Sequence, residues 1–76
     1  MYYVYLLRDR RTRQLYSGYT NDLKRRLGEH EHKGAWEVVY YEAYKSESDA
    51  RRRERQLKHY AQALTALKAR IKDSLE

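Results

Sequence analysis

The sequence contains no cysteine and no proline, and only three of its 76 residues are glycine. Without cysteine, neither a disulfide nor a thiolate metal site can form, and a reducing cytoplasm is the expected location. The absence of proline argues against linkers, so we expect a single domain over residues 1–76. No apolar run is long enough to cross a membrane, and no signal peptide is expected, since Met1 leads directly into an apparent strand.

Basic residues are what the sequence has in excess. Lys and Arg number 17 against 11 Asp and Glu, which gives a formal net charge of +6 at pH 7. Such a balance favours a polyanionic partner, most simply nucleic acid. The basic residues gather in the run RDRRTR at 8–13 and in ARRRERQLK at 50–58. A small folded domain can display such faces to solvent alone, so charge by itself does not establish nucleic-acid binding.

Three stretches have the pattern of β-strands. Residues 2–7 (YYVYLL) are apolar or aromatic on both faces, as expected for a strand at the centre of a sheet. Residues 14–19 (QLYSGY) follow the arginine-rich turn and should pair with the first strand as a hairpin. Residues 35–44 (AWEVVYYEAY) supply the third strand. Gly18 could provide a positive φ or leave room for a ligand to approach the backbone.

Helical patterns fill the remainder of the chain. A cap at residues 20–21 opens the first helix, which should end near His30. Ser46, with an acidic residue three positions later, opens another. A further apolar stripe follows this helix in the sequence. The two patterns form either one helix to about Lys72 or two helices with a bend near residues 60–62. The predicted order is β-β-α-β-α-α, an α+β domain with a small three-stranded antiparallel sheet flanked by helices.

Two groups of polar residues have positions that suggest chemistry. Glu54 shares a helical stripe with Ala50 and Leu57, so its carboxylate should face inward. An inward carboxylate needs a partner, and composition alone favours a salt bridge to a nearby arginine over a bound cation. Arg26 and His30 are one helical turn apart. That spacing suits phosphate binding and proton transfer, but it is equally typical of a solvated basic helix.

The sequence has nine tyrosines and no phenylalanine. Tyr5 and Tyr16, on the first two expected strands, could orient a water or act as phenolate bases, although an unperturbed tyrosine has a pKa of about 10. Aromatic residues in strands more often pack in the core, so both interpretations stay open at this point. His32 and His59 have no partner at a metal-ligand spacing, and no zinc site is expected.

In order and spacing, these residues resemble the GIY-YIG nuclease family, specifically its small stand-alone members related to the N-terminal domain of the excinuclease C subunit. The signature triplets correspond to YVY at residues 3–5 and YSG at 16–18. Tyr3 stands where glycine is usual, and Ser17 where isoleucine is usual. The closer matches are GYTNDL at 18–23, RRL at 25–27, EH at 29–30, VYYE at 39–42 and ARRRERQLK at 50–58.

The resemblance implies an endonuclease that hydrolyses phosphodiester bonds in DNA with a single metal ion, a chemistry used in DNA repair. It implies that Tyr5 and Tyr16 hold or deprotonate the attacking water and that Arg26 stabilises charge on the phosphoryl oxygens. His30 would assist proton transfer or bind phosphate. Glu54 would ligate Mg²⁺ or Mn²⁺, because a hard cation prefers oxygen ligands and retains several waters, so that one carboxylate can suffice.

Further contacts with nucleic acid are expected from Arg13, Tyr19, Arg25, Arg53 and Lys58. One feature departs from the family pattern, since relatives generally have a longer basic loop where EHKGA (31–35) connects the first helix to the third strand. This short connection keeps an alternative open, namely a non-catalytic basic module that binds nucleic acid on the same fold. The chain is expected to be a monomer or a homodimer with exchanged elements, and a dimer joined through residues 63–75 is a third possibility.

Overall fold

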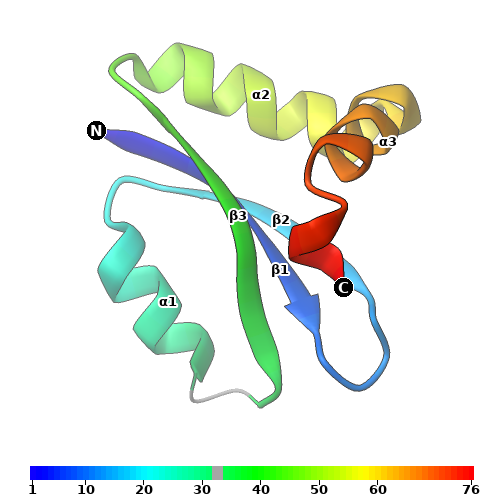
Figure 1. The fold of residues 1–76 in the computed structure, drawn as a ribbon. Coiled ribbons are helices and arrows are strands. Elements are labelled where there is room, and N and C mark those ends of the chain that lie inside the picture. Colours follow the sequence, from blue (N-terminus) through cyan, green and yellow to red (C-terminus); the bar gives the residue numbers. More distant parts are fainter. Residues whose placement is uncertain (32–33) are drawn as a thin grey trace.

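The computed structural model describes residues 1–31 and 34–76, with side chains up to residue 29 and from residue 34 onward. Its elements follow the predicted order β-β-α-β-α-α (Figure 1). The strands are β1 (Tyr2–Asp9), β2 (Leu15–Thr20) and β3 (Trp36–Tyr44). The helices are α1 (Leu23–Glu31), α2 (Glu47–His59) and α3 (Ala61–Arg70), followed by a short 3-10 helix, η1 (Asp73–Leu75).

The strands form one antiparallel sheet in the order β2-β1-β3, which confirms β1 as the central strand. Val4 to Leu7 are all buried, as the doubly apolar sequence predicts. Val4 and Leu6 pack in a core cluster with α2 and α3 on one face. Tyr5 and Leu7 point to the other face, which α1 covers (Figure 1). β1 extends beyond its predicted end at Leu7 because its next two residues pair with β3.

The C-terminal helical pattern forms two helices rather than one. Tyr60 leaves helical geometry, with φ −120° and ψ 103°, and it both ends α2 and precedes α3. Leu57 of α2 and Leu67 of α3 are buried in the same core cluster. A single straight helix would carry Leu67 away from the sheet, so tertiary packing sets the bend where no glycine or proline marks it.

A buried carboxylate ties β3 to α2. Glu42 accepts hydrogen bonds from Tyr40 and Tyr44, each at 2.6 Å, and from Arg53 Nε at 3.0 Å. Burial raises the pKa of Glu42, but these three donors outweigh it and the net pKa is lowered. Burial, followed by the bond to Glu42, raises the pKa of each of the two phenols to about 12. Arg53 is therefore part of the framework of the fold.

A second buried charge fixes the C-terminal turn. Arg8 donates to Glu37 at 2.7 Å and to the backbone carbonyls of Leu75 and Glu76. These bonds join η1 to β1 and β3. None of the helices in the described part of the chain combines the length and apolar character that a membrane span requires.

Candidate active site

Tyr5 lies at the centre of the candidate site. It occupies the middle of β1 with none of its surface exposed, opposite Gly18 on β2. A Cβ atom built on Gly18 would approach Tyr5 Oη and Cζ to less than 3.0 Å, so the phenol ring lies directly against the glycine backbone. Gly18 does not have a positive φ. Close approach is therefore the reason for glycine at this position.

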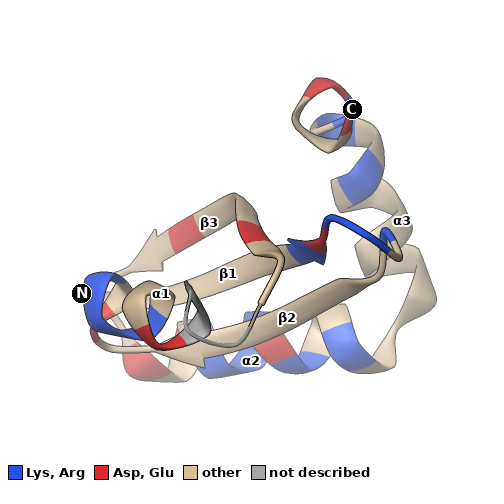
Figure 2. Cartoon of the chain, turned by 90° about the horizontal axis from the view of Figure 1, so that it is seen from below, with Lys and Arg blue, Asp and Glu red and all other residues tan. Residues whose placement is uncertain are grey.

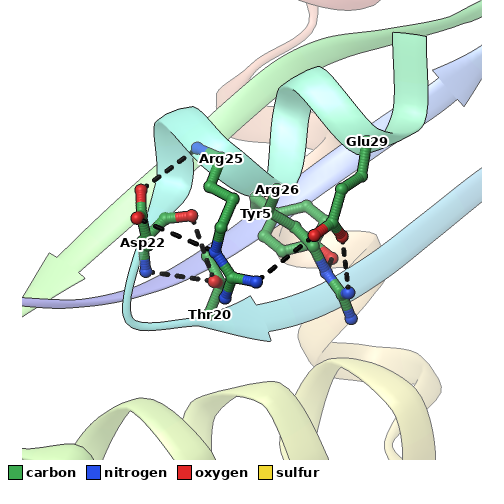
Figure 3. Close-up of polar contacts among 6 residues, drawn as sticks. All are labelled: Tyr5, Thr20, Asp22, Arg25, Arg26 and Glu29. Atoms are coloured by element: carbon green, nitrogen blue, oxygen red, sulfur yellow. Dashed lines mark hydrogen bonds and ion pairs between the residues drawn. The ribbon is translucent and has the colours of Figure 1, made fainter. Parts of the chain in front are cut away.

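Helix α1 brings Arg26 to the same phenol. Arg26 Nε donates to Tyr5 Oη at 3.1 Å, and Arg26 Nη1 donates to Glu29 at 3.2 Å (Figure 3). These bonds, that to Tyr5 first, raise the pKa of Arg26, so its guanidinium stays charged. The Arg26 side chain is 41% exposed. Arg26 thus connects a fully buried phenol to the surface, where an anion can reach it.

Hydrogen bonds from Thr20 and Asp22 fix the start of α1, the helix that carries Arg26. Thr20 Oγ1 accepts from the backbone N–H of Asp22 at 3.1 Å, and Asp22 Oδ1 accepts from that of Arg25 at 3.1 Å (Figure 3). The side chain that accepts from an N–H of the first helical turn is therefore that of Asp22. The predicted cap was at residues 20–21, directly before it. Asp22 satisfies a donor that the first turn of a helix leaves without an intrahelical partner.

Helix α2 brings Glu54 to the sheet. Its side chain is 21% exposed, as the stripe with Ala50 and Leu57 predicts, and Lys58 Nζ donates to Glu54 Oε2 at 2.9 Å. The ion pair favoured by composition is thus present, but its cation is a lysine one turn later rather than an arginine. The i, i+4 spacing of the two residues was the signal in the sequence that could have identified it.

Lys58 links Glu54 to the tyrosines. Its Nζ lies 5.6 Å from the centroid of the Tyr16 ring. The hydrogen bond with Glu54 raises the pKa of Lys58, burial opposes this increase, and Coulombic attraction to Glu54, Tyr16 and Tyr5 adds to it. Lys58 therefore lies within electrostatic range of Glu54 and of both phenols. We call Tyr5, Tyr16, Arg26, Glu54 and Lys58 the active cluster.

Tyr16 forms the accessible side of this cluster. It is 42% exposed and lies two residues before Gly18 on β2, hence on the same face of the sheet as Tyr5. Its ring meets Trp36 of β3 edge-on, with 6.2 Å between centroids. Sequence reasoning missed this contact because strand neighbours depend on the order β2-β1-β3. His30 lies in α1 one turn after Arg26, but its side chain is outside the described residues, and its role stays a prediction.

The residues predicted to contact nucleic acid lie in several places. Lys and Arg recur along α2 and in the turn between β1 and β2 (Figure 2). Arg13 is exposed in that turn, and Arg25 is exposed beside Asp22 and Glu29. Tyr19 donates to Glu47 at 2.7 Å, beneath the guanidinium of Arg51. Arg53 is engaged by Glu42 and Lys58 by Glu54, so Arg13 and Arg25 are the more accessible members of the predicted set.

The donors in the active cluster fit a hard divalent cation. Glu54 supplies a carboxylate whose side chain is only 21% exposed, and the exposed side at Tyr16 leaves room for water and phosphate oxygens. Within the described ranges, no group of three or more His, Cys, Asp or Glu residues could hold a metal. A metal at this place would therefore have Glu54 as its single protein carboxylate, which is the arrangement that the family resemblance implies.

Comparison with known proteins gives one match. Residues 1–68 match the family model of the GIY-YIG catalytic domain, a range that includes the whole active cluster. No curated protein and no solved structure matches the chain. The family consists of endonucleases that typically use a divalent metal, so the match implies a nuclease-type activity with nucleic acid as the substrate.

Proposed function

Because the chain belongs to the GIY-YIG family, we propose that it is a Mg²⁺- or Mn²⁺-dependent endonuclease that hydrolyses phosphodiester bonds in DNA. The observation that carries the proposal is that Lys58, the ion-pair partner of Glu54 on α2, lies over the Tyr16 ring of β2, while Tyr5 of β1 accepts from Arg26 of α1. The cysteine-free sequence suits a cytoplasmic location.

Arg26 is the residue that would bind the scissile phosphate. Its guanidinium is held at Nε by Tyr5, while its exposed end can donate to two phosphoryl oxygens. Glu29, now paired with Nη1, would give way to the more highly charged substrate. Charge that builds up on the phosphoryl oxygens during the reaction would be stabilised by this preorganised donor.

The two tyrosines would divide the handling of water. Tyr16 is exposed and can hold the attacking water at the surface of the cluster. Tyr5 is fully buried and accepts from Arg26, so it positions the guanidinium relative to that water. A divalent cation, held by Glu54, would polarise the phosphoryl group and assist the leaving oxygen. His30 would add a proton donor or a further phosphate contact.

We expect the purified protein to nick supercoiled plasmid and to cut single-stranded DNA with Mg²⁺ present. Chelation by EDTA should lower the rate at least about a hundredfold, because the cation stabilises charge in the transition state. Gel assays with DNA and RNA strands of the same sequence measure the rate of cleavage and show which of the two is cut faster. Failure to cut any strand with either metal would reject the nuclease. Salt-sensitive binding without cleavage would instead support the non-catalytic nucleic-acid module.

A further inference from the structure

We propose that Lys58 is a tethered cation that occupies the Glu54 carboxylate until a divalent metal displaces it. The inference rests on the proposed function, since it concerns how the metal site of that function is loaded. Lys58 Nζ lies 2.9 Å from Glu54 Oε2, at the distance of a charge-assisted hydrogen bond. The described structure therefore already has a positive charge on the one carboxylate expected to bind metal.

The position of Lys58 is determined by two partners. Its ammonium group is bonded to Glu54 and also lies over the face of the Tyr16 ring, 5.6 Å from the centroid. Its side chain is 40% exposed, compared with 21% for Glu54. A glutamate followed four residues later by a lysine is the favourable orientation of such a pair on a helix. Lys58 is thus directed into the active cluster rather than away from it.

Metal binding must change this arrangement. A divalent cation and an ammonium group on the same carboxylate repel each other, and repulsion between charges a few Å apart is substantial even at a partly exposed site. Lys58 must therefore leave Glu54 as the metal arrives. A phosphate group of the substrate offers the released ammonium a new anionic partner, in agreement with the nucleic-acid contact predicted for Lys58 from the sequence.

The same helix contains a matched pair in which the glutamate is more exposed. Arg51 pairs with Glu47 at 3.6 Å, also four residues apart, and lies over the ring of Tyr19 at 4.6 Å. Both side chains of this pair are more than half exposed. Arg51→Met therefore removes one positive charge from an equivalent pair on α2, and it serves as the control for Lys58→Met.

The test measures Mn²⁺ binding by electron paramagnetic resonance, without nucleic acid, in the parent protein and in variants. Lys58→Met and Lys58→Gln should bind Mn²⁺ about ten-fold more tightly than the parent, because the competing charge is gone. Arg51→Met should stay within about twofold of the parent, because Arg51 is exposed and pairs with Glu47 rather than with Glu54. Circular dichroism verifies that each variant is folded.

The outcomes separate the inference from the function it rests on. Equal Mn²⁺ affinity in Lys58→Met, Lys58→Gln and Arg51→Met would overturn the inference, since Lys58 would then not compete for Glu54. Glu54→Gln should eliminate the Mn²⁺ site. If Glu54→Gln instead binds Mn²⁺ as the parent does, or if neither the parent nor any variant binds it, the metal assignment of the proposed function fails. That result does not depend on how the Lys58 variants compare with the parent.

Discussion

Replacing Glu54 with glutamine is expected to lower the rate of DNA cleavage by about a thousandfold while leaving the fold intact. Glutamine keeps the size and the helical position of the side chain but removes the charge that would hold the metal. Its neighbours Ala50 and Leu57 would still pack against the sheet. The effect is measured as the initial rate of plasmid nicking at saturating Mg²⁺, beside a thermal melt that reports stability.

Asp49→Asn is the control for Glu54→Gln. Asp49 is another acidic residue of α2, 54% exposed and paired with Arg52 at 3.1 Å, and it takes no part in the active cluster. We expect this variant to cut DNA within about twofold of the parent rate, since surface ion pairs contribute little. Cleavage by Glu54→Gln at the rate of Asp49→Asn would show that the carboxylate at position 54 has no role in the reaction.

Gly18→Ala is expected to damage both stability and activity. The added methyl group would overlap the phenol of Tyr5, which is fully buried and cannot move without displacing its neighbours. Overpacking of this kind costs about 1–3 kcal/mol of unfolding free energy. Displacement of Tyr5 would also release Arg26. The rate of cleavage should then fall by about a hundredfold, the size of effect expected when a catalytic group is misplaced. Urea unfolding and plasmid nicking measure the two effects.

Gly28→Ala is the matched control for Gly18→Ala. Among the described residues, a Cβ atom on Gly28 would have no heavy atom within 4 Å other than those of its own turn of α1. Alanine at this helical position should stabilise the protein by about 0.5–1 kcal/mol and leave cleavage unchanged. A Gly18→Ala protein as stable and as active as Gly28→Ala would mean that Tyr5 is not held against the backbone of β2.

Local pattern was sufficient to predict much of this molecule. The doubly apolar run YYVYLL predicted the central strand, and the stripe through Ala50 and Leu57 predicted that Glu54 faces inward. Both predictions depend on the periodicity of one element, which neighbouring sequence determines. For Gly18 the sequence suggested a positive φ or room for a ligand, but the group against its backbone is the Tyr5 phenol, which depends on the register of β1 and β2.

Long-range partners could not be predicted in this way. Arg53 was expected to contact nucleic acid, but it is bonded to Glu42 of the preceding strand, β3, a partner that depends on how α2 packs on the sheet. The bend at Tyr60 has no glycine or proline to mark it, because packing of both flanking helices on one core produces it.

The most direct test of the central claim is the anomalous diffraction signal of a crystal soaked in Mn²⁺. The claim is that Glu54 holds the catalytic cation beside Tyr5 and Tyr16. The account predicts a peak at ligand distance from the carboxylate of Glu54, with the ammonium group of Lys58 moved away from it. A peak on other carboxylates, with Glu54 still paired to Lys58, would contradict it.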